Sequence, residues 1–348
     1  MPEPAASVLS ASPVDSAVRH SYPLAIRNAS LSTALKLFLR TLPYALARFG
    51  VLVGMSVVGI VWAVVTFGGG AWLGEKVHSV VGLGWIAAGC GGLGWVWRFI
   101  LRYALHLMKC GHVAVLTELI VRGQIGNGTE GMFSYGKRVV RDRFTQVNVL
   151  FALDHLVDGV VRAFNGTLDW VANLLPIPGM DGLMRVVKAI LFSASTYLDE
   201  TIFSYLLARG DANPWRGGQD GLIYYCQNAK PVLKTALWVV VLDKVLSAVL
   251  WGLMLLPALL VTQLIGGATA IWAIALAVLF AANARSAFLE PIFLIMVMTT
   301  FHVAVEGQPI NAEWDGRLTA MSGKFKELKD QALAWTGGKA DASTAASA

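Results

Sequence analysis

The stretch 49-FGVLVGMSVVGIVWAVVTFGGGAWLG-74 decides the fold class, because it contains no charged residue. At about 1.5 Å per residue, a helix of this length exceeds the roughly 30 Å hydrocarbon thickness of a bilayer. A second uncharged run, 77–97, follows directly after Glu75 and Lys76. The two runs predict a hairpin of membrane-spanning helices, with a tight turn at 68–76 that is formed by Gly68–Gly70 together with Glu75 and Lys76.

The composition supports the same class. Of 348 residues, 56% are hydrophobic and only 14% are charged, and the mean hydropathy is +0.60. Soluble domains carry about 25% charged residues, so this chain lacks the charge that an ordinary water-soluble enzyme needs. The composition also excludes a disordered chain, a collagen-like fibre and a disulfide-stapled secreted domain. We therefore predict an all-α, polytopic integral membrane helical bundle.

Long apolar runs predict four membrane spans, which lie at 49–70, 79–102, 235–261 and 267–304. Two further helical patterns carry charges and would bring the total to six spans, at 144–164 and 184–207. The membrane domain thus covers residues 44–305. A tail with a basic amphipathic helix precedes it at 1–43, and an amphipathic helix with a small-residue tail follows at 306–348.

Basic residues gather in the N-terminal region, in the polar, Gly-rich loop 122–143 and in the segment 209–234. The turn at 262–267 carries none. Because lysine and arginine mark cytoplasmic loops, both termini should be cytoplasmic in a multi-pass protein of the cell membrane. The basic loops favour anionic lipid headgroups as partners, and without a dense basic stripe we expect no nucleic acid.

The remaining motifs favour packing over chemistry. Gly89, Gly91 and Gly94 spell GxGxxG, but they lie inside a membrane run, where small residues serve close helix contacts. The Gly-rich faces at 50–70 and 82–94 are candidate interfaces of a homo-oligomer. No nucleophile–base pattern or complete metal-ligand set occurs, so we expect no enzymatic activity, no catalytic residue, no metal and no cofactor.

Charges inside the last two spans are more informative, since each costs roughly 2.5–3.5 kcal/mol on insertion scales. The turn at 262–267 is centred at 264.5, so Asp243 lies 21.5 residues before it and Arg285 lies 20.5 residues after it. Equal depth predicts an ion pair between them. Glu290 lies nearby before Pro291, which should disturb the helix, and Lys244 adjoins Asp243. This group serves either in gating or as a pair that fixes helix register.

A second acidic group lies on the less apolar helices. It comprises Asp154, Asp158, Asp199 and Glu200, with Tyr197 and Trp238 on nearby elements. Carboxylates with aromatic faces suit a quaternary ammonium ion, because cation–π attraction replaces the hydrogen bonds that such an ion cannot make. These six residues are therefore candidates for substrate binding. The alternative is that the aromatic side chains line the headgroup belt.

From Leu183 onward, the order of features resembles the choline transporter-like protein family. The resemblance is carried by TYLDETIFSYLLAR, then DGLIYYCQNAKPVLKTALWVVVLDKVL, LAVLFAANARSAFLEPIFLIMV and EGQPINAEWDGRLTAMSGKFKEL. It covers the C-terminal half of the chain, which has fewer spans than that family. The resemblance implies a membrane carrier for choline or a related amine.

The resulting hypothesis is a transporter for choline or a related small organic cation, in which the hairpin 235–305 moves against the helices 144–208. The alternative is a non-transporting membrane scaffold or a subunit of a larger membrane complex. A cavity lined by the carboxylates would favour transport, whereas closed ion pairs would favour the scaffold.

Overall fold

The computed structural model describes residues 22–143, 190, 193, 195–210, 213–265 and 270–335. Within these ranges the chain is helical and contains no strand. Among the described residues, three helices are long and apolar enough to cross a membrane: Leu42–Lys76, Ala229–Leu264 and Ile271–Val305. The membrane helical class is thus confirmed in its coarse form.

The predicted spans fare differently along the chain. Spans 49–70, 235–261 and 267–304 correspond to the three long apolar helices. Span 79–102 begins with a shorter apolar helix, Ser79–Gly91. Span 144–164 lies outside the described residues, as do 184–189, 191, 192 and 194 of span 184–207, so the count of six stays a prediction.

The first hairpin is built from six helical segments in sequence. They are α2 (Leu42–Ala63), the π-helical turn η1 (Val64–Gly68), α3 (Gly69–Lys76), α4 (Ser79–Ala88), the π-helical turn η2 (Gly89–Leu93) and α5 (Gly94–Arg122). The predicted turn at Gly68–Gly70 is wrong, because the helix continues through these glycines. The chain reverses at Val77 and His78 instead, where the His78 side chain caps α4 by accepting from the Val80 amide at 3.2 Å.

Glycines let the two legs of this hairpin touch. A Cβ on Gly70 would overlap Ile86, and a Cβ on Gly82 would overlap the backbone of Gly70 and Gly74. Small residues permit close helix approach within lipid, where no hydrophobic force drives association. The run of glycines near position 70 therefore serves packing rather than reversal of the chain.

The two π-helical turns face each other across the hairpin. Thr66 of η1 lies against Gly89 of η2, since a Cβ on Gly89 would overlap the Thr66 side chain. The Trp62 indole donates to the Gly89 carbonyl at 3.3 Å, and the Trp85 indole donates to the Val65 carbonyl at 3.1 Å. A π-turn disturbs the regular carbonyl pattern, and these indoles supply donors that lipid cannot provide.

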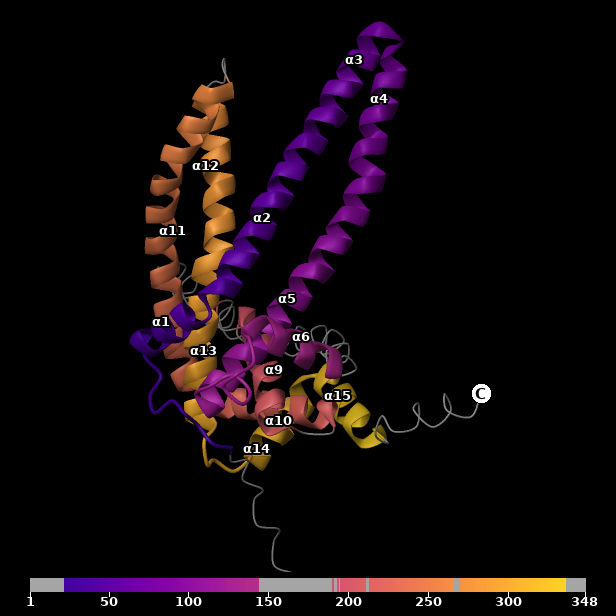
Figure 1. Cartoon of the computed structure of the whole chain (residues 1–348). Helices are drawn as coiled ribbons and strands as arrows, with labels where there is room; N and C mark the ends of the chain where they lie inside the picture. The colour runs from indigo at the N-terminus through magenta and orange to yellow at the C-terminus, as the bar shows by residue number, and fades with distance from the viewer. Residues whose placement is uncertain are drawn as a thin grey trace, which may run out of the picture.

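The second hairpin joins α11 (Ala229–Ile265) to α12 (Ala270–Ala284), which continues through the π-helical turn η3 (Arg285–Leu289) into α13 (Glu290–Val305). The disturbance of the helix expected near Pro291 takes the form of η3, which ends two residues before it. Both hairpins point the same way, away from a group of shorter helices (Figure 1). The segments that enter α2 and leave α13 therefore lie on the same side of the molecule.

The shorter helices form a cap at the base of the hairpins. They are α1 (Leu31–Arg40), α6 (Met132–Asp142), α9 (Leu198–Arg209), α10 (Pro214–Gln227), α14 (Ala312–Met321) and α15 (Gly323–Ala334). The loop predicted over 122–143 is wrong in its second half, where α6 packs Met132, Tyr135 and Val140 against the core. Glycines mask this helix in the sequence.

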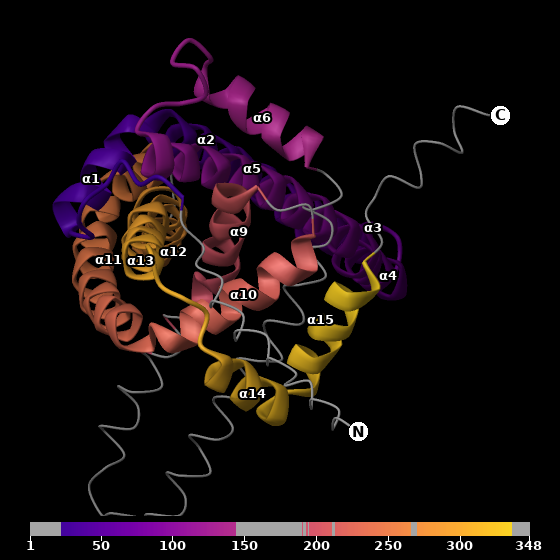
Figure 2. The ribbon, with the colours of Figure 1, turned by 90° about the horizontal axis from the view of Figure 1, so that it is seen from below.

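Burial divides the molecule in two. The cap and the adjoining part of α5 hold a packed core around Val113, Leu116, Phe203 and Phe301, which are almost fully buried. Viewed from below, α9 is surrounded by α5, α10 and α13 (Figure 2). The first hairpin, α11 and α12 instead expose large apolar side chains, including Val61, Val64, Leu253, Leu256, Leu260 and Trp272, whereas most of α13 is buried in the core. Such surfaces need a lipid environment.

Candidate functional site

The charges inside the second hairpin form a connected network. Arg285 donates through Nε to Asp243 at 2.8 Å and through Nη1 to Glu290 at 3.2 Å. The ion pair between Asp243 and Arg285 that the register arithmetic predicts is therefore present. Ser247, one turn beyond Asp243, also donates to its carboxylate at 3.3 Å.

Arg48 of α2 joins this network from the first hairpin. Its Nη2 donates to Glu290 at 2.8 Å and to the Ser286 hydroxyl at 2.9 Å, and Ser286 itself donates to Glu290 at 2.9 Å. Glu290 is consequently shared by two guanidinium groups from different hairpins. Two carboxylates and two arginines balance in charge, and the four side chains are half-buried. No pattern in the sequence indicates that Arg48 belongs to this network.

The π-helical turn η3 supplies part of this network. Arg285 and Ser286 lie within it, and Glu290 begins α13 directly after it. Pro291 has no backbone N–H to donate, so a regular α-helix is interrupted at this position. π-turns occur frequently at functional sites. The charged residues thus lie where the helix is least regular.

A second ion pair lies beside the network, between Lys109 of α5 and Glu200 of α9. Glu200 is buried, with a side chain 10% exposed. Burial lowers the pKa of Lys109, but the charge and hydrogen bond of Glu200 outweigh it, so the net pKa is raised. Arg48 and Glu290 also act electrostatically on Lys109, which places this pair close to the shared carboxylate.

The residues predicted to bind an organic cation are only partly brought together. Asp154 and Asp158 lie outside the described residues. Tyr197 is buried next to the first turn of α9, where Asp199 lies half-buried and Glu200 is occupied by Lys109.

The other two predicted positions lie on α11. Trp238 is 56% exposed. It lines a cavity together with Lys234, and none of Tyr197, Asp199 and Glu200 contributes to that cavity. Lys244 is exposed beside Asp243. The structure therefore gathers the predicted charge group around Arg285 rather than an aromatic cage.

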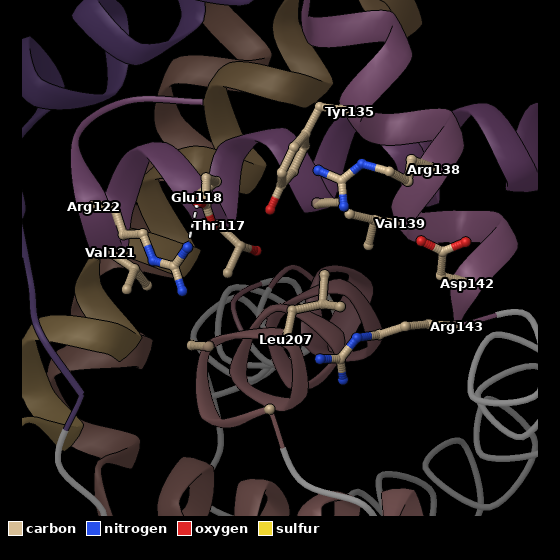
Figure 3. Close-up of a pocket in the computed structure, with 13 residues that line it drawn as sticks. Thr117, Glu118, Val121, Arg122, Tyr135, Arg138, Val139, Asp142, Arg143 and Leu207 are labelled. Atoms are coloured by element: carbon tan, nitrogen blue, oxygen red, sulfur yellow. Dashed lines mark hydrogen bonds and ion pairs between the residues drawn. The ribbon is translucent and has the colours of Figure 1, made fainter. Parts of the chain in front are cut away.

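A cavity of about 550 Å³ opens between α5, α6 and α9 (Figure 3). Its charged lining comprises Glu118, Arg122, Arg138, Asp142 and Arg143. The Tyr135 hydroxyl points toward Glu118 (Figure 3), and burial together with the charge of Glu118 raises the pKa of Tyr135. With three arginines against two carboxylates, this lining suits an anion better than an organic cation. This cavity was not predicted from the sequence, because the segment after Arg122 was expected to be a loop.

Two of these arginines are held in place. Arg138 donates to both carboxylate oxygens of Glu130, at 3.0 and 2.6 Å, and Arg122 donates to Glu118 at 3.0 Å. The hydrogen bond from Arg138 lowers the pKa of Glu130. Bidentate pairing fixes the guanidinium plane, so Arg138 presents a defined edge to the cavity.

A buried hydrogen-bond chain runs from the N-terminal segment to this cavity. Tyr22 contacts Nδ1 of His302 at 2.7 Å, Nε2 of His302 contacts Ser204 at 2.7 Å, and Ser204 contacts Thr117 at 2.7 Å. Each ring nitrogen has a hydroxyl partner, which a neutral imidazole satisfies with one donor and one acceptor. Thr117 lines the cavity. These hydrogen bonds join α5, α9 and α13 in the core.

Within the described part of the chain, no three His, Cys, Asp or Glu side chains gather as a metal site would require. Comparisons of this chain with protein-family models, with curated proteins and with solved structures give no match.

Proposed function

We propose that this chain is a multi-pass protein of the cell membrane that carries choline or a related small organic cation. The observation that supports this proposal most directly is that Glu290 pairs with both Arg48 and Arg285, which belong to different hairpins. The resemblance to the choline transporter-like family supports the substrate class. The basic loops place both termini in the cytoplasm under this proposal.

Sharing one carboxylate between two cations creates an element with alternative pairings. When Glu290 releases Arg48, it keeps Arg285, and the second hairpin is then free to move against α2. A competing cation that enters near Asp243 or Glu290 would bias this exchange, as differential binding to two states requires. The half-burial of these groups makes the exchange less costly than it would be in a dry core.

A second candidate is a non-transporting membrane scaffold or a subunit of a larger complex. It is favoured by the closed pairing of Asp243, Glu290 and Glu200, each of which contacts a basic side chain. In this case the network fixes the register of the hairpins, and the cap presents its surface to a partner.

Uptake of labelled choline into proteoliposomes of the purified protein separates the two candidates. The carrier predicts uptake above empty vesicles and its loss in Asp243→Asn, with the variant still folded and reconstituted. Glu313→Gln serves as the control, because Glu313 is exposed in α14 and pairs only within its helix. The absence of uptake by the wild-type protein would contradict the choline carrier. Loss of folded Asp243→Asn would favour the register role.

A further inference from the structure

The second cavity lies where two candidate spans end. It has a volume of about 860 Å³ and is bounded by the segment Arg27–Leu31, the first turns of α11 and the last turns of α13. Thr235 of α11 and Thr300 of α13 both line it, and their hydroxyl groups are hydrogen-bonded to each other at 2.9 Å. Its lining is charged at one end and apolar at the other.

The charged end holds Arg27 of the N-terminal segment and Lys234 of α11. Both side chains are exposed, and neither forms an ion pair with a described carboxylate. This contrasts with Arg48 and Arg285, which are paired. Two unpaired cations facing one cavity call for an anion.

The apolar end continues along the two spans. It is lined by Leu242 of α11 and by Met296, Val303 and Ala304 of α13, with Trp238 between the ends. Lys234 and Leu242 are eight residues apart, as are Ala304 and Met296, so the apolar surface extends about 12 Å along each helix. A free inorganic anion would leave this surface unused, whereas an acyl chain would cover it.

Helix α1 sets the level of the cavity relative to the membrane. Its residues Leu31, Leu35 and Leu39 form one exposed stripe, being 49%, 45% and 58% exposed, while Leu37 and Phe38 pack inward. An amphipathic helix of this kind lies in the membrane interface with its apolar stripe in lipid. Leu31 itself lines the cavity, which therefore opens at headgroup depth, where tryptophan is enriched.

We propose that this cavity binds one anionic phospholipid, with the phosphate between Arg27 and Lys234 and an acyl chain along Leu242 and Met296. The site is independent of transport, because neither cation belongs to the charge network around Glu290. A bound lipid would tie α1 to both legs of the second hairpin at the membrane surface.

Native mass spectrometry of the detergent-purified chain, after incubation with equimolar phosphatidylglycerol and phosphatidylcholine, tests this site. The wild-type protein should retain one phosphatidylglycerol in preference. The double variant Arg27→Gln/Lys234→Gln should retain at least about tenfold less, since each cation contributes roughly fivefold near an anionic surface. The matched control Lys137→Gln/Lys326→Gln removes the same charge from exposed positions on α6 and α15 and should behave as wild type.

Two further arms separate the sources of the phosphate and guard against misfolding. Excess inorganic phosphate should not displace the lipid, because it cannot occupy the apolar end. Ala304→Trp fills the apolar end of the cavity without changing its charge. It should lower the retention of phosphatidylglycerol while the protein stays folded. Equal retention of both lipids, displacement by inorganic phosphate, or unchanged retention in Arg27→Gln/Lys234→Gln would each overturn the proposal.

Discussion

Arg48 on α2 and Glu290 on α13 are separated by 242 positions in the chain and joined by an ion pair of 2.8 Å. This contact links the first hairpin to the second at their base. Because Glu290 also accepts from Arg285, the stability of one hairpin depends on the pairing within the other.

Breaking this link should reveal that dependence as energetic coupling. We expect Arg48→Met and Glu290→Gln each to destabilise the protein by about 1–3 kcal/mol, because each leaves a charged partner with fewer hydrogen bonds. The double variant should cost less than the sum of the two single variants, because residues in contact are energetically coupled.

The measurement is a double-mutant cycle of the free energy of unfolding in mixed micelles. Arg317→Met, in an exposed helical pair with Glu313, should cost below about 0.5 kcal/mol. Strict additivity would contradict the link.

Removing Lys109 from its ion pair with Glu200 should cost more stability than a change at an exposed pair. Glu200 is buried, and one of its carboxylate oxygens has no hydrogen-bond partner. Lys109→Met should cost about 3 kcal/mol, because it leaves a buried charge uncompensated. Adding Glu200→Leu should recover much of that loss. Thermal unfolding in detergent measures both effects, with Lys244→Met as an exposed control. If the double variant Lys109→Met/Glu200→Leu is less stable than Lys109→Met, then Lys109 does not serve to compensate the buried charge of Glu200.

Two neighbouring glycines on α4 provide a matched test of the hairpin contact. Gly82→Leu should destabilise by about 1–3 kcal/mol, since its side chain would overlap the backbone of Gly70 and Gly74. Gly84→Leu should have little effect, because no atom lies within 4 Å of a Cβ built there. The melting temperatures of the two variants in detergent decide the comparison. Equal shifts would show that helix propensity, rather than close approach, sets the cost.

Acid should destabilise the cap through His112. This residue is buried, stacks on Tyr44 with ring centroids 5.0 Å apart, and has a pKa lowered to about 3 by burial and by the charge of Arg48. The unfolded chain has the ordinary value of 6.5, so it binds more protons between these values. Stability is therefore complete above pH 6.5 and declines as pH falls toward 3.

Replacing His112 by Phe should flatten this part of the pH profile. The measurement is the melting temperature of wild type and His112→Phe at a series of pH values below 6.5. His78→Gln is the control, because His78 is exposed at the tip of the first hairpin. A variant that loses stability with the same slope as wild type would exclude His112 as the cause.

The sequence predicted contacts whose geometry is set within one hairpin. Asp243 and Arg285 flank a short turn, so counting residues from that turn places them at equal depth. Arg48 could not be found in this way, because its depth relative to Glu290 depends on how the two hairpins pack. The same limit applies to Lys109, which neutralises a carboxylate predicted to attract substrate.

Glycine misled the prediction in two places. Gly68–Gly70 suggested a turn, but these positions are helical, with Gly70 in contact with the opposite leg. Glycines also concealed α6, where a Cβ on Gly136 would overlap the Tyr44 hydroxyl. Composition alone does not distinguish a glycine that bends the chain from one that makes room for a neighbour.

The facing π-helical turns η1 and η2 have a consequence for chain length. Each π-turn accommodates about one residue more than an α-helical turn, which rotates everything beyond it by about 100°. The tip of the first hairpin is thereby set at a different rotational phase from its base. Losing one residue from η1 would turn Gly70 away from Gly82 while Arg48 stayed in place. An insertion or deletion in one leg would therefore change the rotational position of the tip relative to the base. We expect the number of residues in each leg to be constrained even at positions that tolerate different side chains.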